Sequence, residues 1–163
     1  MPLNIAVGSD HHGIIVRVKV AERLRQQGHV VAEFGPPLDA TLAVDYPDVA
    51  AEVASRVSRK ESDRGILVCG TGIGMCITAN KFDGVRAAPV VNEITAELSR
   101  RHNDLNVLCL SGDLLGEETA VRIVNLWIST PFDGGRHERR IQKITDIEKE
   151  LQSRKTELDR QAS

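Results

Sequence analysis

The residue types best suited to chemistry stand together in the segment Cys69-Gly70-Thr71-Gly72-Ile73-Gly74-Met75-Cys76. An apolar run at residues 65–68 precedes this segment and has the composition of a buried parallel strand. A stretch compatible with a helix, residues 76–81, follows it. A glycine-rich turn between a strand and a helix directs backbone N–H groups to one place, where the helix dipole favours negative charge. A thiol beside that turn predicts a nucleophile or base that faces an oxyanion or a phosphate.

Cys69 has a second interpretation, because a free cysteine at the end of a strand is often just a small buried apolar side chain. On residue type alone the two interpretations are about equally good. The glycine turn and the helix N-terminus favour the reactive one, since both stabilise a thiolate. We expect the other two cysteines, Cys76 and Cys109, to be structural.

Three familiar phosphate or nucleotide motifs do not fit the glycine segment. A dinucleotide fingerprint needs a further glycine where Met75 stands. The anion loop of a cysteine phosphatase needs an arginine at that same position, so a thiol-dependent phosphatase is disfavoured. A Walker-type loop needs a lysine followed by serine or threonine after its glycines, and this segment has neither.

Three further polar groups are candidates for a site. Asp10 and His11 follow the first predicted strand, where they either cap a turn or bind hydroxyls and phosphate. Residues 100–104 are either a cationic cluster that stabilises a helix C-terminus or a binding group. Arg136 and Arg140 are one helical turn apart, so they form either a solvated basic face or a two-pronged phosphate clamp.

The elements that must position these residues alternate between strand and helix along the chain. The pattern predicts an α/β fold, a Rossmann-like three-layer sandwich with a five-stranded parallel sheet and right-handed crossovers. The predicted strands are residues 3–8, 29–34, 65–69, 85–91 and 107–110. The predicted helices are residues 14–27, 45–60, 76–81, 92–102 and 116–128, with Asp45 and Asn92 as N-caps. Because parallel sheets bind ligands beyond the carboxyl ends of their strands, we expect Asp10, Cys69 and residues 111–113 to share one site.

The pattern changes after Gly135. We therefore assign residues 1–135 to an α/β domain and residues 136–163 to a charged helix and tail of the same domain. The apolar stripe of this helix is thin for a core element, so we expect it to pack along a partner or along the parent domain. Its members are Ile141, Ile144, Ile147, Leu151 and Leu158.

Composition argues against several classes of function. The formal net charge of −2 argues against a nucleic-acid binder, and an aromatic content of 3% leaves few platforms for base stacking. The odd number of cysteines, 3, favours reduced thiols and a cytoplasmic location, and no CxxC pair suggests zinc. We expect no signal peptide, and no membrane span either, since no apolar run approaches the roughly 20 residues that a span requires.

Seven segments of the chain, taken together, resemble one enzyme family in their order and spacing. These are Gly8-Ser9-Asp10-His11-His12-Gly13, Asp45-Tyr46-Pro47, Cys69-Gly70-Thr71-Gly72-Ile73-Gly74, Ala79-Asn80-Lys81, Leu98-Ser99-Arg100-Arg101-His102-Asn103-Asp104, Asn106-Val107-Leu108 and Phe132-Asp133-Gly134-Gly135-Arg136-His137. The family is the type B ribose-5-phosphate isomerases, which includes galactose-6-phosphate isomerase subunits. The resemblance covers roughly residues 3 to 147.

The resemblance implies an aldose–ketose isomerase that acts on a phosphosugar through an enediolate, without metal or cofactor. Ribose 5-phosphate and ribulose 5-phosphate are the usual pair. Cys69 would move the proton between C1 and C2, and Thr71 would relay protons among the substrate oxygens. His102, assisted by Asp10, would open the sugar ring. The implied binding residues are His11, Arg136 and Arg140 for the phosphate, and Tyr46 and Asn103 for hydroxyls. The backbone amides of Gly72 through Cys76, which include Gly74 and Met75, would stabilise the enediolate oxygen, and Gly70 is a further implied substrate-binding residue.

The resemblance also implies a homodimer or a dimer of dimers, with His102, Asn103 and the arginines supplied to each site by the partner. Three features differ from the family pattern. Asp113 stands where the family often carries an arginine, Cys76 stands where a serine is frequent, and the tail beyond Glu148 is longer than usual. Two alternatives therefore stay open. The substrate is a tetrose, hexose or deoxy sugar phosphate, or the chain is a non-catalytic phosphosugar-binding subunit.

Overall fold

A computed structural model describes residues 1–161, and the last two residues of the predicted tail, 162 and 163, lie outside the described residues. The centre of the fold is a five-stranded parallel sheet in the order β2-β1-β3-β5-β4. The strands are β1 (Asn4–Ser9), β2 (Val30–Phe34), β3 (Arg64–Cys69), β4 (Ala87–Pro89) and β5 (Val107–Ser111). The helices are α1 (Ile14–Gln26), α2 (Tyr46–Ser58), α3 (Ile73–Ala79), α4 (Glu93–Asn103), α5 (Glu117–Ser129) and α6 (Arg136–Gln161). The predicted α/β class is confirmed.

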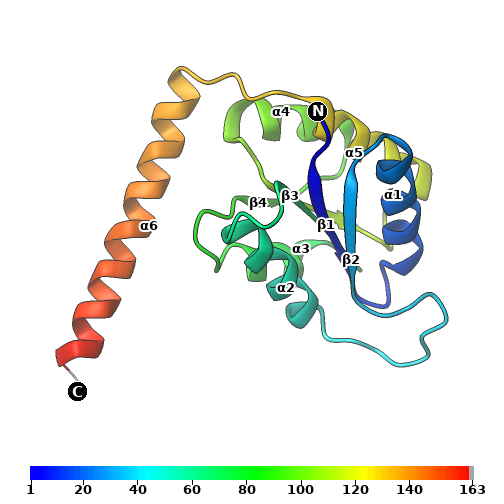
Figure 1. Cartoon of the computed structure of the whole chain (residues 1–163), viewed down its shortest axis with the longest axis horizontal. Helices are drawn as coiled ribbons and strands as arrows, with labels where there is room; N and C mark the ends of the chain where they lie inside the picture. The colour runs from blue at the N-terminus through cyan, green and yellow to red at the C-terminus, as the bar shows by residue number, and fades with distance from the viewer. Residues whose placement is uncertain (162–163) are drawn as a thin grey trace.

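Helices cover both faces of the sheet (Figure 1). Helices α1, α4 and α5 pack on one face around Trp127, which is fully buried. Helices α2 and α3 pack on the other face, where Val53 and Met75 are fully buried. Successive residues of β3 enter alternate cores, so the last of them, Cys69, lies on the face covered by α2 and α3. Burial on both faces explains why the central strands read as continuous apolar runs.

The predicted strand at residues 85–91 is wrong in its length, because β4 has only three residues. Val85 belongs to a turn, in which its N–H donates to the Phe82 carbonyl at 3.1 Å. Pro89 has no N–H to donate to a ladder, which shortens pairing on this edge strand. A run of apolar residues could not distinguish the strand from the turn that precedes it.

Helix α3 begins at Ile73, three residues earlier than predicted. Gly72 caps it with φ +78°, a left-handed conformation that turns the chain from β3 into the helix. A Cβ on Gly72 would also lie 3.1 Å from the Leu110 carbonyl oxygen, so the position requires glycine for space as well. The earlier start places the N-terminus of α3 beside Cys69.

One of the two predicted N-caps is confirmed. The N–H of Thr95 donates to Asn92 Oδ1 at 2.8 Å at the start of α4. Asp45 occupies the N-cap position of α2, but its side chain accepts no capping hydrogen bond. The N–H of Asp48 donates instead to the Asp45 carbonyl at 3.3 Å.

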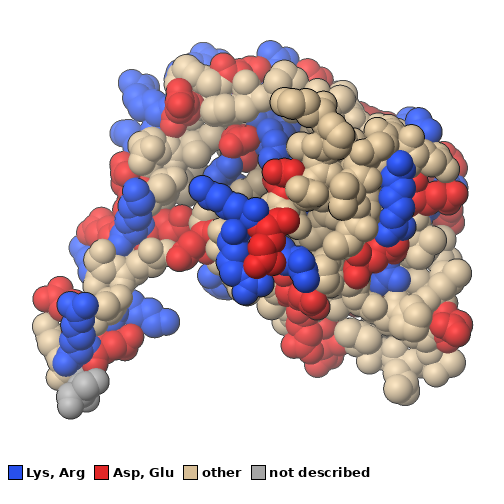
Figure 2. Space-filling model, in the orientation of Figure 1, with Lys and Arg blue, Asp and Glu red and all other residues tan. Residues whose placement is uncertain are grey.

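Helix α6 stands apart from the body of the molecule (Figure 1). The N–H of Gly84 donates to both carboxylate oxygens of Glu148, at 3.0 and 3.1 Å, and thereby ties the middle of the helix to the body. Acidic and basic side chains are interspersed along its surface (Figure 2). Four of the five residues of its apolar stripe face solvent: between 53% and 66% of each residue is exposed at Ile144, Ile147, Leu151 and Leu158. Among residues 1–161, no helix is both long enough and apolar enough to cross a bilayer.

Candidate active site

Cys69 ends β3 and is 4% exposed. The chain folds back over its side chain, and the N–H of Gly72 donates to Cys69 Sγ at 3.1 Å. This bond fixes the position of the sulfur beside the N-terminus of α3. The position therefore combines the two interpretations of Cys69: the residue is buried, and its sulfur is held by the turn.

The first-turn amides of α3 divide into occupied and available donors. The N–H of Gly72 binds the Cys69 sulfur, that of Ile73 binds Thr71 Oγ1 at 3.3 Å, and that of Cys76 binds the Gly72 carbonyl at 3.1 Å. The first N–H groups of a helix have no partner within the helix. The available donors in this turn are therefore those of Gly74 and Met75, a smaller set than the resemblance implied.

Tyr46 lies directly over this turn. It is the first residue of α2, and a Cβ built on Gly74 would lie 2.6 Å from its ring carbons Cε2 and Cζ. The Tyr46 ring passes against the backbone of Gly74 and leaves no room for a side chain at this position. The side chain is 40% exposed, so the ring both packs on the turn and faces the solvent in front of it.

Asp10 and His11 lie at the same edge of the sheet. The N–H of Asp10 donates to the Val68 carbonyl at 3.2 Å, which joins the end of β1 to the residue before Cys69. The Asp10 carboxylate is buried and accepts the N–H of His12 at 2.9 Å. The side chain of His11 is exposed, with its Nδ1 3.4 Å from the N–H of Val44.

Asp113, which was expected at this edge, and His12, which had no predicted role, complete it. His12 Nδ1 lies 3.0 Å from Asp113 Oδ1, and the two side chains are 48% and 50% exposed. Asp113 Oδ2 lies 2.8 Å from the place where a Cβ on Gly70 would stand. The loop after β5 therefore lies against the loop after β3, as the predicted clustering of residues 111–113 with Cys69 requires.

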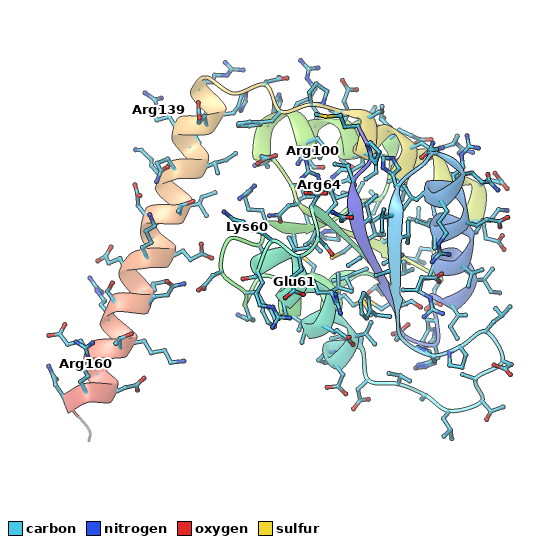
Figure 3. All side chains as sticks on the ribbon, viewed as in Figure 1. Lys60, Glu61, Arg64, Arg100, Arg139 and Arg160 are labelled. Atoms are coloured by element: carbon cyan, nitrogen blue, oxygen red, sulfur yellow. The ribbon has the colours of Figure 1, made fainter. Side chains whose placement is uncertain are left out.

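The remaining predicted residues lie at the opposite edge of the sheet. His102 and Asn103 end α4, which returns the chain from β4 to the start of β5. The N–H of Gly65, at the start of β3, donates to the Asn106 carbonyl at 2.8 Å, so this edge is the amino end of the strands. Figure 3 shows Arg100 of α4 close to Arg64, the first residue of β3. At about 3.3 Å per residue, the length of β3 separates this edge from Cys69 by about 17 Å.

Arg136 and Arg140 belong to the same second group. The N–H of Asp133 donates to the Arg101 carbonyl at 3.1 Å, and Arg101 Nε contacts both carboxylate oxygens of Asp133 at 3.2 Å. These contacts dock the loop that precedes α6 on the last turn of α4. One chain therefore brings the predicted site residues into two separate groups, which we call half-sites. The first contains Asp10, His11, Tyr46, Cys69 and the 70–76 turn, and the second contains His102, Asn103, Arg136 and Arg140.

His137 is a residue of the second half-site that had no predicted role. Its ring stacks on the His102 ring with a centroid distance of 4.3 Å and an interplanar angle of 1°. Its signal in the sequence was its place beside Arg136 in the glycine-arginine-histidine segment, but only the contact with His102 distinguishes it from a surface histidine.

His102, Asp133 and His137 offer ligand atoms within 4.8 Å of one another, which raises the question of a metal ion. The geometry argues against this. The two imidazole planes are parallel and separate, so their in-plane lone pairs do not converge on one point. Arg101 already engages the Asp133 carboxylate.

Cys76 differs from its prediction as a structural cysteine. A hydrogen bond from Cys109 lowers its pKa to about 7, against the opposing effect of burial, and a bond from Asn80 lowers it further. The pKa of Cys109 is raised in turn, by its bond to Cys76 and by burial. Cys76 is half-buried and its sulfur lies 3.4 Å from the Ala87 carbonyl. Sequence inspection missed this pair because β5 and α3 meet only in the folded chain.

Iodoacetamide at neutral pH is expected to alkylate Cys76 before Cys69. The Cys76 thiol is half ionised near pH 7 and partly exposed, whereas Cys69 is 4% exposed. The labelling rate should therefore rise as the pH passes about 7 and level off above it. Peptide mass spectrometry at partial modification measures the order, and prior labelling of Cys69 would contradict it. Alkylation by itself is consequently no test of Cys69, and substitution is needed.

Comparison with known proteins identifies the family. A family model described as ribose/galactose isomerase matches residues 5–144. The chain belongs to this family. It is an aldose–ketose isomerase of the ribose-5-phosphate isomerase B type, and its prediction as an enzyme is confirmed.

Three relatives illustrate the range of the family. A "probable ribose-5-phosphate isomerase B" of Mycoplasma genitalium is 44% identical over 93% of this chain and 100% of its own length. A crystal structure of ribose-5-phosphate isomerase B from that organism "with bound ribulose-5-phosphate" superposes with a TM-score of 0.85 and 45% identity, over 90% of this chain and 97% of the other. A "D-erythrulose-4-phosphate isomerase" of Pectobacterium atrosepticum is 36% identical over 87% of this chain and 93% of its own.

Proposed function

We propose that this protein interconverts the aldose and ketose forms of a phosphorylated sugar, first of all ribose 5-phosphate and ribulose 5-phosphate, with Cys69 as the base. One observation carries the proposal. The Cys69 sulfur and the first-turn amides of α3 lie at the same turn, so a base and an anion-binding group face one place. The relatives with this activity in their names support the choice of substrate.

The chemistry needs a base near neutral pH and a donor for a developing oxyanion. The Cys69 thiolate would take the proton from C2 of the open-chain aldose, leaving an enediolate. The N–H groups of Gly74 and Met75 would stabilise the negative oxygen. The thiol would return the proton to C1 to give the ketose, while Thr71 Oγ1 relays a proton between the two oxygens. No metal or cofactor enters these steps.

The other predicted site residues would bind and open the sugar. His102, with Asp10, would protonate the ring oxygen, a step that suits the pKa range of histidine. His11, Arg136 and Arg140 would hold the phosphate, which supplies binding energy remote from the reacting carbons. Tyr46 and Asn103 would contact hydroxyls; the ring of Tyr46 already borders the turn.

We propose further that the complete site forms between two copies of the chain, in a homodimer or a dimer of dimers. Within one chain, the two half-sites lie at opposite edges of the sheet. Helix α3 also exposes two apolar side chains beside the first half-site, Ile73 at 54% and Ile77 at 58%. A second copy that covers them could bring its own His102 and arginines to the Cys69 turn. The reduced thiols are consistent with a cytoplasmic location.

A different phosphosugar is the second candidate, and Asp113 favours it. This carboxylate stands beside Gly70, where it opposes a phosphate and can accept hydrogen bonds from hydroxyls. A relative whose name gives a four-carbon sugar phosphate supports such a change within the family.

Isomerisation of four-, five- and six-carbon aldose phosphates by the purified protein, with EDTA present, tests the proposal. Preference for ribose 5-phosphate supports the first candidate and makes Asp113 a tolerated difference. Preference for another sugar supports the second candidate. If no sugar is turned over, the catalytic proposal fails, and the chain would be a binding subunit that needs a partner.

Arg136→Ala is expected to raise KM for phosphorylated sugars by about tenfold or more, because an arginine–phosphate contact is lost. The kcat should change much less, since the phosphate is remote from the reacting carbons. Steady-state kinetics on a phosphorylated sugar and its unphosphorylated counterpart measures the difference. An equal rise in KM for both sugars would show that Arg136 does not bind the phosphate.

A further inference from the structure

His137 is a buried titratable group that the proposed mechanism does not use. It is the second residue of α6 and is 7% exposed, although its neighbours Arg136 and Glu138 are exposed. Its N–H donates to the Gly134 carbonyl at 3.1 Å, so the tight turn before α6 fixes its backbone. A histidine buried at the start of an otherwise exposed helix needs an explanation in its contacts.

The first contact is the stack on His102. The rings are parallel, with centroids 4.3 Å apart, and the two residues come from different helices, α4 and α6. A flat ring that covers one face of His102 restricts the rotation of its side chain. The ring that is proposed to protonate the sugar would then present its edge in one direction only.

The second contact is with Arg136. Arg136 Nε donates to His137 Nε2 at 3.3 Å, so this nitrogen must carry a lone pair and the ring must be neutral, with its proton on Nδ1. The surroundings agree. Burial lowers the pKa of His137 below its ordinary value, and His102, Arg136 and Arg140 lower it further, with Asp133 acting in the opposite sense. Because His137 is neutral, it can accept a hydrogen bond from the Arg136 guanidinium without repelling its positive charge.

The docking of this segment gives the two contacts a fixed frame. The loop before α6 is held on α4 by the contacts of Asp133 with Arg101, through both backbone and side chain. His137 therefore sits between two groups that the proposed mechanism assigns to different tasks, ring opening and phosphate binding. The apolar face of its ring contacts His102, and its Nε2 atom accepts the hydrogen bond from Arg136.

We propose that His137 is a positioning residue that holds His102 and Arg136 in a fixed relation, through its ring face and its Nε2 atom respectively. The assignment of tasks to those two residues rests on the proposed function. The contacts themselves do not, and they can be measured without catalysis. The proposal predicts that the two features of the ring can be separated by substitution.

His137→Phe keeps a flat ring for the stack and removes the acceptor. We expect KM for the phosphorylated sugar, and the dissociation constant for inorganic phosphate, to rise on the order of tenfold, with kcat close to that of the wild type. His137→Gln removes the ring and retains an amide oxygen that can accept from Arg136. We expect the reverse: kcat for the cyclic aldose phosphate falls on the order of tenfold, while affinity for inorganic phosphate changes little.

Two readouts separate this proposal from the proposed function and from a merely structural role. The NMR chemical shifts of the His102 imidazole should change in His137→Gln and stay nearer to those of the wild type in His137→Phe, whether or not the protein is active. Arg139→Gln is the matched control, since Arg139 is an exposed cation of the same turn (Figure 3) and should leave both readouts unchanged.

Three results would overturn the proposal. In the first, His137→Phe binds inorganic phosphate as the wild type does. In the second, the His102 resonances are unmoved in His137→Gln. In the third, both variants lose kcat and phosphate affinity together with thermal stability, which is a structural effect. An inactive wild type with these binding and resonance changes intact would instead contradict the proposed function alone.

Discussion

Cys69→Ser is expected to lower kcat by about a hundredfold or more and to leave the fold intact. A serine hydroxyl fits the space of the thiol, but it is not ionised near neutral pH and makes a poor base. The N–H of Gly72, which now donates to the sulfur at 3.1 Å, can donate to the hydroxyl oxygen. The loss should therefore appear in the chemical step, measured as kcat under saturating aldose phosphate, with circular dichroism and thermal melting as checks on folding.

Cys109→Ala is the matched control for this substitution. Cys109 is fully buried on the same face of the sheet and has no proposed role in catalysis. The Cys109→Ala substitution should lower the stability, since it truncates a buried side chain, but should change the activity little. Cys69→Ser turnover within a few-fold of wild type would remove Cys69 from the role of base. A comparable loss of kcat in both variants would point to disturbed packing instead.

Mixed dimers of the Cys69→Ser and His102→Asn variants are expected to have activity that neither variant has alone. If each site takes Cys69 from one chain and His102 from the other, a mixed dimer has one site with both substitutions and one site with neither. Random pairing makes half of the dimers mixed, so the mixture should reach about a quarter of the wild-type activity. Coexpression, or unfolding and refolding of the two variants together, followed by a kcat measurement tests this.

Asp10→Asn mixed with Cys69→Ser provides the control. Both residues belong to the first half-site, so every site in a mixed dimer retains one of the two substitutions. The activity of the mixture should not exceed the average of the activities that the two variants show separately. If Cys69→Ser and His102→Asn fail to complement while each forms dimers, the two groups do not meet between chains, and the composite site is wrong.

The sequence predicted the parts of this molecule that depend on local chemistry. Buried apolar runs and glycine stops indicated the parallel sheet, and the strand–turn–helix pattern around Cys69 indicated an anion-binding turn; both follow from residue patterns over a few positions. Asn92 was predicted as an N-cap and is one. These features need only neighbours along the chain, so the sequence carries them.

Other predictions failed where distant segments decide the outcome. The strand at 85–91 shrinks to three residues, and α3 starts at Ile73, after Gly72 turns the chain with φ +78° beside Leu110 of β5. The pKa of Cys76 is lowered to about 7 by a hydrogen bond with Cys109, across the packing of α3 on β5. The spacing of the cysteines along the chain does not predict the contact between Cys76 and Cys109.

By itself, the sequence determined the α/β class, the strand–turn–helix arrangement at Cys69 and, through the order of its motifs, the family. Only the tertiary structure decided how the site residues are grouped. Strand β3 separates Cys69 from the end of α4, and the docking of the 133–137 loop on α4 joins His137 to His102. The reason is physical: local pattern sets the conformation of a segment, whereas the distance between two segments is set by the sheet and the helices packed between them.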